Sequence, residues 1–175
     1  MDEVFSDGQV IRKMHELSEK ETGVLKILGQ RRLAIDAQTL CDHLDLLVGS
    51  KVAEVIISNT AFAIGKEDVS RILRTKPDAT VIEIVEFFMQ EQRLSGVGTC
   101  KVNFRSEKSV ELEIANPVLK PTSGSARAML VSRWCGALSE VLNEKMIADR
   151  VEYDEVMGVL TCRIGPSIVG KKIET

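Results

Sequence analysis

The chain has 175 residues and a mass of 19.3 kDa, which fits one domain whose core is large enough to fold without disulfides or metals. Its net charge of −3 is spread along the sequence, and its one Trp, one Tyr and five Phe are too few for base stacking, so we expect no nucleic-acid partner. Uncharged apolar stretches stay well short of the ~20 residues that span a bilayer, and the acidic first residues do not resemble a signal peptide. These features predict a cytoplasmic protein with no transmembrane segment.

The first residues are predicted to form a helical arm followed by a strand. Sparse apolar residues at helical spacing indicate a helix over 9–21. The apolar run that begins at Val24 indicates a strand, and residues 33–35 either return as its hairpin partner or lead into a helix.

Two helices are expected next. Asp36 is a suitable N-cap for a helix over 37–48, which has one apolar side. After Gly49 a second helix is apolar nearly all round, so we expect it to be the fully packed central helix. Gly65 is predicted to end it, and a short charged helix over 67–74 is expected to follow.

The remaining pattern alternates between helices and hairpins. Asp78 or Thr80 is expected to cap a helix that ends near Leu94, after which the apolar period changes from 3.6 to 2. The later elements are a half-exposed hairpin over 99–114, a long helix over 125–143 with small residues along one side, and a second hairpin over 145–164. Segregated helices and hairpins of this kind predict an α+β fold with an antiparallel sheet.

Few residues in the chain suggest catalysis or metal binding. The sequence has no phosphate-binding glycine loop, no nucleophile elbow and no C-x-x-C pair, so the four cysteines are expected to be free thiols, mostly buried. Cys41 and His43 lie two positions apart on a helix and cannot face one metal. Cys135 could line a cavity, although a packing role is favoured.

The last hairpin holds the one candidate metal pair. With a three-residue turn that contains Gly158, Asp154 and Cys162 would be direct cross-strand partners and could supply two ligands to a divalent ion. Cys162 also alternates with apolar neighbours, so packing alone would place it inward.

The region after Val110 resembles a known family. Its segments read V-E-L-E-I-A-N-P-V, then L-V-S-R-W-C-G-A-L-S-E-V-L-N-E, then R-V-E-Y-D and, after a turn, V-L-T-C-R-I. Three features are similar to the 4-vinyl-reductase domain, which occurs in predicted hydrocarbon-binding proteins: a strand that ends in N-P, a helix with a C-G pair, and a final hairpin of this kind. They are also similar to the Bet-three-like subunits of the TRAPP vesicle-tethering complex. The resemblance covers residues 23–165, with a helical arm over 1–22 and a tail over 166–175.

The resemblance implies long helices packed on an antiparallel sheet, an apolar pocket for a small molecule or acyl chain, and a homodimer or a pairing with a related subunit. Many relatives carry a cysteine on each strand of the last hairpin as a proposed metal site. Here those positions hold Asp154 and Cys162. The resemblance implies zinc as the metal, although Asp154 stands where the relatives have the first cysteine. TRAPP relatives acylate a cysteine after the second core helix, and residues 65–75 contain none.

Three hypotheses follow, and the first is favoured because three helices have more apolar surface than one core face needs. The first is a non-catalytic binding domain for a hydrocarbon, acyl chain or aromatic molecule. The second is a TRAPP-like assembly or tethering subunit, whose apolar faces are protein interfaces. The third is a vinyl reductase, which is disfavoured because the sequence has no nicotinamide or flavin fingerprint. The helix faces suggest six lining residues for the pocket: Ile56, Phe62, Val85, Phe88, Trp134 and Leu138.

Overall fold

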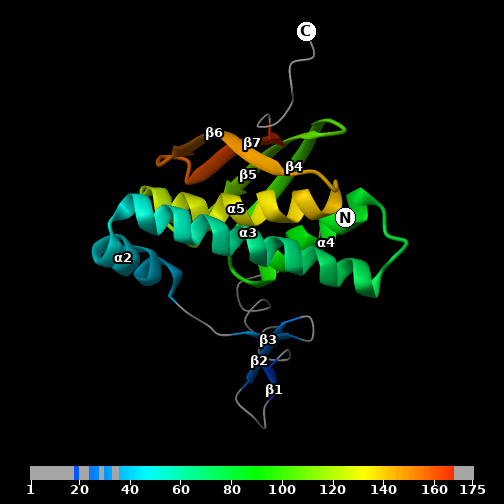
Figure 1. The fold of residues 1–175 in the computed structure, drawn as a ribbon, viewed down its shortest axis with the longest axis horizontal. Coiled ribbons are helices and arrows are strands. Elements are labelled where there is room, and N and C mark those ends of the chain that lie inside the picture. Colours follow the sequence, from blue (N-terminus) through cyan, green and yellow to red (C-terminus); the bar gives the residue numbers. More distant parts are fainter. Residues whose placement is uncertain (1–17, 20–23, 28–29, 33–35, 168–175) are drawn as a thin grey trace. The chain divides into compact units, whose positions relative to one another are not determined.

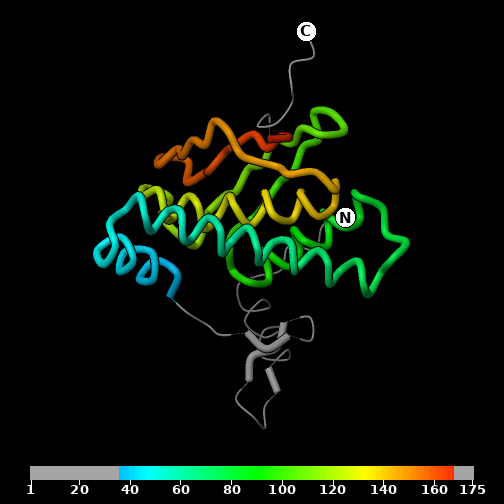
Figure 2. Tube along the Cα trace, viewed as in Figure 1, coloured from blue at the N-terminus to red at the C-terminus, as the bar shows by residue number. Residues whose placement is uncertain are grey.

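The computed structural model divides the chain into two compact units, 1–36 and 37–175. Figure 2 traces the second unit in colours that run from blue to red along the sequence. It describes residues 18–19, 24–27, 30–32 and 36–167. The first unit holds a three-stranded antiparallel sheet made of β1 (Ser18–Glu19), β2 (Val24–Ile27) and β3 (Gln30–Arg32).

The strand predicted from Val24 is confirmed as β2, whereas the helix predicted over 9–21 is wrong at Ser18–Glu19. These two residues pair with Leu25 and Val24 in an antiparallel ladder. The backbone N–H and C=O groups therefore find partners on a neighbouring strand, where in a helix they would bond to the same segment. The other residues of that predicted helix, and residues 33–35, lie outside the described residues. The arm boundary expected between residues 22 and 23 falls inside the first unit.

The second unit confirms the predicted α+β class (Figure 1). Its four strands form one antiparallel sheet in the order β4-β5-β7-β6. None of the helices that the structure describes is long and apolar enough to cross a membrane. The elements are α2 (Ala37–Val48), α3 (Ser50–Thr75), α4 (Val81–Leu94), β4 (Thr99–Ser106), β5 (Ser109–Ala115), α5 (Gly124–Val141), β6 (Met146–Asp154) and β7 (Val159–Pro166).

One face of the four-stranded sheet is buried against the helices and the other is charged. Along β5 and β7 every second side chain is buried, which gives the alternation of a half-buried sheet. On the outer face Lys101 Nζ lies 2.9 Å from Glu113 Oε1, and Arg163 lies 3.7 Å from Glu111. The inner face is lined by Val110, Leu112, Ile114, Leu160, Cys162 and Ile164.

Helix α3 is one continuous helix, so the break predicted at Gly65 is wrong. A Cβ on Gly65 would overlap the carbonyl oxygen of Arg133 on α5, and a Cβ on Gly136 of α5 would overlap the carbonyl oxygen of Phe62 on α3. The two glycines let the backbones of α3 and α5 come into direct contact. Gly65 is therefore a packing residue, because a glycine inside a helix permits the close approach of another backbone.

The first half of α3 is not the fully packed helix that its apolar sequence predicted. A narrow stripe is buried, including Ala53, Ile57 and Ala61, whereas Val52 and Val55 on the opposite side are about half exposed. Because the chain covers only one side of the helix, the excess apolar residues remain at its surface.

The N-terminus of α4 shows how its sequence specifies where the helix begins. Of the two predicted caps, Thr80 is the one used: its hydroxyl accepts a hydrogen bond from the Glu83 backbone N–H, and the Glu83 carboxylate accepts one from the Thr80 backbone N–H at 2.8 Å. This capping box satisfies two donors that the first turn leaves without partners. It fixes the start of the helix that carries Val85 and Phe88.

Candidate functional site

Four of the six predicted pocket residues are fully buried in one hydrophobic core. Val85 and Phe88 come from α4, and Trp134 and Leu138 come from α5. The rings of Phe88 and Trp134 meet edge to face, with centroids 4.7 Å apart and an angle of 85° between their planes. The structure thus brings these four residues into one core, while their role in binding a ligand stays a prediction.

Two buried N–H donors beside these rings, Trp134 Nε1 and Gln92 Nε2, have no oxygen or nitrogen acceptor within the described residues. The Trp134 N–H has only the Cys100 thiol, a weak acceptor, beside it. Gln92 lies one helical turn after Phe88 on the same face of α4, and its Oε1 accepts a hydrogen bond from Arg133 Nη1 at 3.2 Å. The Trp134 N–H lowers the pKa of the Cys100 thiol, although burial has the larger effect and raises that pKa to about 11. Polar hydrogens therefore lie in the interface between α4 and α5, beside the rings of Phe88 and Trp134.

A buried ionic cluster lies next to this interface and joins three helices. Asp68 of α3 is paired with Arg71 of its own helix and with Arg133 of α5, whose Nε donates to Asp68 Oδ2 at 3.0 Å. Glu91 of α4 lies 3.5 Å from Arg133 and 3.9 Å from Arg71. The Arg133 guanidinium also lies 5.6 Å from the centroid of the Phe88 ring. Two positive and two negative side chains make the cluster neutral overall.

The sequence analysis missed this cluster, although a signal for it was present. Once the helix is continued through Gly65, Asp68 falls in the same stripe as Ala61 and Ile72. A charged residue within an apolar stripe indicates a buried ion pair. The predicted break at Gly65 concealed the stripe, and Gln92 had no signal of its own.

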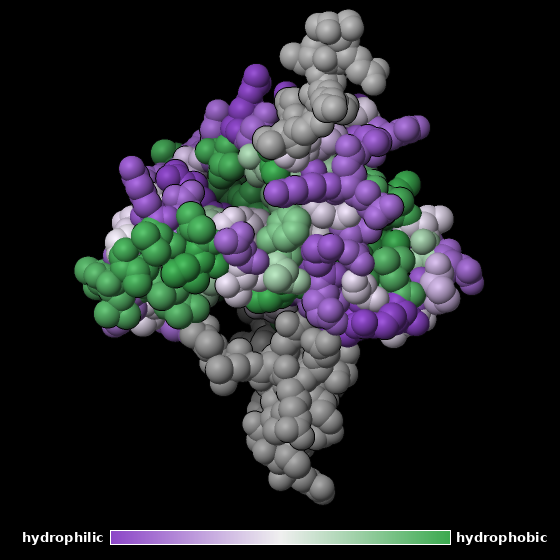
Figure 3. All heavy atoms as spheres, in the orientation of Figure 1, coloured by the Kyte–Doolittle hydropathy of each residue, from purple (hydrophilic) through white to green (hydrophobic). Residues whose placement is uncertain are grey.

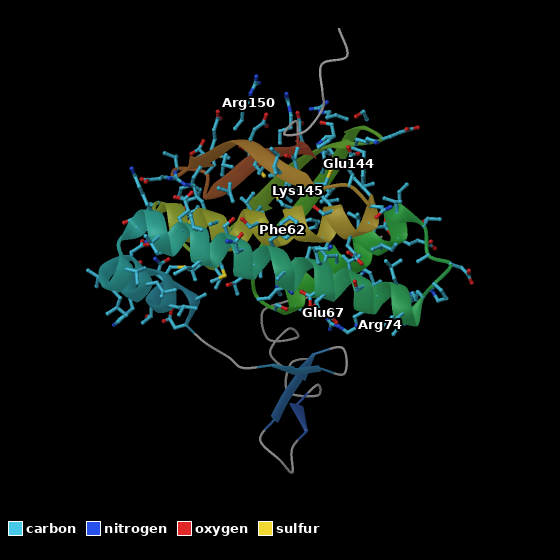
Figure 4. All side chains as sticks on the ribbon, viewed as in Figure 1. Phe62, Glu67, Arg74, Glu144, Lys145 and Arg150 are labelled. Atoms are coloured by element: carbon cyan, nitrogen blue, oxygen red, sulfur yellow. The ribbon has the colours of Figure 1, made fainter. Side chains whose placement is uncertain are left out.

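The fifth predicted residue, Phe62, lines an open groove between α3, α5 and β6. Figure 4 labels Phe62 on α3 and Lys145 just before β6, and both belong to the groove wall. The volume is about 520 Å³, and the Ser58 and Ser132 hydroxyls are joined across it at 2.8 Å. Cys135 also lines this groove while being almost fully buried, so both roles considered for it from the sequence are present. The other lining residues are Glu54, Asn59, Gly124, Arg127, Ala128, Val131, Met146, Ile147, Ala148 and Val151.

The sixth predicted residue, Ile56, lies on the exposed side of α3 and is not part of the groove wall or of the buried core. Its neighbours there are apolar as well. Ile56 therefore belongs to an exposed apolar surface at the start of α3. Figure 3 shows apolar residues gathered over α2 and the adjoining end of α3.

The cross-strand pairing predicted for Asp154 and Cys162 is wrong. Asp154 pairs with Val159, because the turn is formed by residues 155–158 and begins directly after Asp154. Cys162 instead lies opposite a β-bulge at Arg150–Val151. The Asp154 carboxylate instead accepts hydrogen bonds from the backbone N–H groups of Val156 and Met157, both at 2.9 Å. Cys162 is buried under the sheet, so the two residues do not fit a shared zinc site. The described part of the chain contains no group of three or more His, Cys, Asp or Glu side chains placed to hold a metal ion.

Burial raises the pKa of the cysteine thiols. It raises the pKa of Cys135 and of Cys162 from 9.0 to about 12, and Cys135 adds to the effect on Cys162. Burial, together with the carboxylates of Asp45 and Asp42, also raises the pKa of Cys41.

We expect Cys135 and Cys162 of the native protein to react slowly with dithionitrobenzoate at pH 8, because burial that raises the pKa of each thiol to about 12 leaves very little of the reactive thiolate. All four cysteines should react rapidly once the chain is unfolded in guanidinium. The absorbance of released thionitrobenzoate measures both rates. Rapid reaction of Cys135 or Cys162 in the native protein, identified by peptide mass, would contradict this prediction.

Comparisons with known proteins locate the fold but do not establish a family. No protein-family model matches this chain, and neither does any curated protein. The structure is similar to the phenol-responsive sensory domain of the transcription activator PoxR, solved with phenol, at a TM-score of 0.68 and 14% identity. That match covers 93% of this chain and 92% of the sensory domain. The chain therefore shares its α+β fold with that domain.

Two H-NOX structures also align, at TM-scores too low to carry an argument. One is a Cs H-NOX mutant that contains 4-cyano-L-phenylalanine, with a TM-score of 0.44, 10% identity, and coverage of 94% of this chain and 89% of that one. The other is the I5F mutant of T. tengcongensis H-NOX, with a TM-score of 0.43, 11% identity, and coverage of 90% and 86%.

Proposed function

We propose that this chain is a non-catalytic, homodimeric binding domain for a small, largely apolar molecule that carries one hydrogen-bond-accepting oxygen. The ligand site is the interface of α4 and α5 around Trp134, Phe88 and Gln92. The observation that carries the proposal is a pair of buried N–H groups: that of Gln92 lacks an acceptor among the described residues, and that of Trp134 has only the weakly accepting Cys100 thiol beside it. The resemblance to the 4-vinyl-reductase domain, and a shared fold with a domain that responds to phenol, support it.

The energetic argument concerns those two donors. A buried polar group without a partner destabilises a protein by about 1–3 kcal/mol, so such groups are rare unless something else satisfies them. A ligand oxygen accepting from either N–H would recover that free energy. The edge-to-face rings of Phe88 and Trp134 and the aliphatic side chains of Val85 and Leu138 would contact the apolar part of the ligand.

The ionic cluster favours a neutral ligand over an anion. Arg133 donates to Gln92 and approaches Phe88, but its charge is already balanced by Asp68 and Glu91. A carboxylate that entered this interface would add an unbalanced buried charge. Phenols, neutral ketones and long-chain alcohols meet the requirement.

The test is isothermal titration calorimetry with phenol as the probe, comparing the wild type with Trp134→Phe. The substitution keeps an aromatic ring and removes the N–H, so we expect binding to weaken about tenfold, the effect of losing a hydrogen bond to a buried donor. Phe62→Leu, which changes only the groove, serves as the matched control and should bind phenol as the wild type does. Equal binding by the wild type and Trp134→Phe, or loss of binding in Phe62→Leu alone, would overturn the proposed site.

Native mass spectrometry complements the titration because it needs no assumed ligand. A bound molecule that is retained under native conditions and lost on unfolding would give the mass of the natural ligand. Phenol derivatives or hydrocarbons of that mass can then be titrated against the same variants.

The alternative function is that of an assembly or tethering subunit. One observation favours it, namely the exposed apolar side chains on α2 and α3, which a partner protein could cover. A tethering subunit would bind a different protein through this face and would not require a ligand in the core. Titration of phenol therefore separates the two functions.

A further inference from the structure

The guanidinium of Arg133 contacts a carboxylate on one helix and an amide on another. Its Nε donates to Asp68 Oδ2 of α3 at 3.0 Å, and its Nη2 is paired with the same carboxylate. A contact through two nitrogens fixes the plane of the arginine side chain. The remaining Nη1 donates to Gln92 Oε1 of α4 at 3.2 Å. Arg133 therefore links a buried carboxylate of α3 to a buried amide of α4.

The contact with Arg133 determines which end of the Gln92 amide faces the other way. An arginine offers only hydrogen-bond donors, so the atom that meets Arg133 Nη1 must be the amide oxygen. Turning the amide over would place its NH₂ group against the guanidinium, where neither group can accept a hydrogen bond. Gln92 is 1% exposed, and its Nε2 has no acceptor among the described residues. The amide therefore presents N–H, and not oxygen, on the side away from Arg133.

Both polar groups of the proposed ligand site are consequently donors. Trp134 carries an indole N–H and no acceptor, and the Cys100 thiol beside it accepts only weakly. The carboxylate of Glu91 lies 3.5 Å from Arg133, within the ionic cluster. A ligand hydroxyl can accept through its oxygen, but its own hydrogen then needs an acceptor. A carbonyl oxygen offers two lone pairs and carries no hydrogen.

We propose that the site between α4 and α5 selects a neutral carbonyl compound, such as an aryl ketone, over the corresponding alcohol or phenol, and that Arg133 sets this preference by holding the Gln92 N–H toward the ligand. The inference rests on the proposed function and narrows its class of ligand. Gln92 contacts the ligand oxygen, and Arg133 is a positioning residue that acts through Gln92. A site with fixed hydrogen-bonding groups discriminates strongly, because the wrong ligand leaves a buried polar group unpaired.

The test is calorimetric titration of two probes with the same carbon skeleton, acetophenone and 1-phenylethanol. We expect the wild type to bind the ketone about tenfold more tightly, the effect of one buried hydroxyl hydrogen without an acceptor. Gln92→Glu keeps an oxygen for Arg133 and replaces the N–H that faces the ligand with a second oxygen, so the alcohol should become the tighter ligand. Gln90→Glu makes the same change at an exposed position of α4 and should keep the wild-type preference.

A double variant tests the positioning role of Arg133. Arg133→Met together with Asp68→Asn removes one charge of each sign, so Arg71 and Glu91, which lie 3.9 Å apart, still balance each other. The Gln92 amide can then present either end, and the two probes should bind about equally. A general loss of packing would weaken both probes alike, so the ratio of their affinities reports the orientation of the amide.

The results distinguish this inference from the proposed function. A wild type that binds both probes equally, prefers the alcohol, or binds phenol alone overturns the inference and leaves the proposed function standing. A preference for the ketone that persists in Gln92→Glu or in the double variant also overturns it. A wild type that binds none of the three compounds overturns the proposed function and the inference with it. The wild-type comparison needs no substitution, so it decides the inference even where circular dichroism shows that a variant is unfolded.

Discussion

Replacing Gly136 with alanine should destabilise the second unit by about 3 kcal/mol or more, because overpacking a site where two backbones touch cannot be relieved by a side-chain rotation. The added methyl group would overlap the carbonyl oxygen of Phe62. Relief would require α3 and α5 to separate along their length, which would also disturb the contact at Gly65. Denaturation in urea, followed by circular dichroism, measures the change.

Gly165→Ala is the matched control for this experiment. A Cβ at Gly165 would have no atom within 4 Å, so its effect on the free energy of unfolding should stay within about 0.5 kcal/mol. If Gly136→Ala were equally mild, the close packing of α3 on α5 would be disproved. The same packing predicts that Gly65→Ala is as harmful as Gly136→Ala, because the two glycines make reciprocal contacts.

The parts of the fold that sequence predicted well are those with strong local signals. The helix over 37–48 has the bounds predicted, since one apolar side and a glycine immediately after it define both its face and its end. Thr80 and Glu83 specify the start of α4, and strict alternation specifies β4 and β5. In each case the decisive interaction joins residues near one another in sequence.

The errors arose where the decisive partner is distant in the chain. Gly65 was interpreted as a helix end, although its role depends on Arg133, which lies on another helix. Whether the last turn holds three residues or four has no signal in the residues themselves, so the pairing of Asp154 could not be derived. Burial on α3 was overestimated because an apolar sequence does not say whether the chain itself or a second molecule covers the helix.

In the candidate site, too, the features set by local sequence were predictable and those set by distant partners were not. Hydrophobic spacing alone indicates that Val85, Phe88, Trp134 and Leu138 face inward, and they do lie in the core, but it does not show which polar residues would orient a ligand. Gln92 became a candidate only when its unpartnered amide N–H was seen among apolar neighbours. Apolar positions follow from periodicity, whereas the environment of one polar atom follows from the packing of several helices.

Breaking the ionic cluster should also strongly destabilise the second unit, because Asp68 is almost completely buried and pairs with both Arg71 and Arg133. Asp68→Asn preserves the shape of the side chain and removes its charge, which leaves two arginines facing Glu91 alone. Removing one partner of a buried ion pair typically destabilises a protein by about 3–5 kcal/mol, since the remaining charge stays desolvated without compensation. Thermal and urea denaturation at neutral pH measure the loss.

The exposed pair of Lys101 and Glu113 provides the control, because Glu113→Gln changes the same kind of group at the surface and should have an effect of less than about 1 kcal/mol. A double-mutant cycle of Asp68→Asn with Arg71→Met then measures the coupling. We expect the second substitution to be less harmful in the Asp68→Asn background, because it removes the excess positive charge. Additive effects, or an Asp68→Asn variant as stable as the wild type, would show that the cluster does not hold α3, α4 and α5 together. In that case the arrangement of Gln92 and Phe88 beside Trp134 would have to be maintained by apolar packing alone.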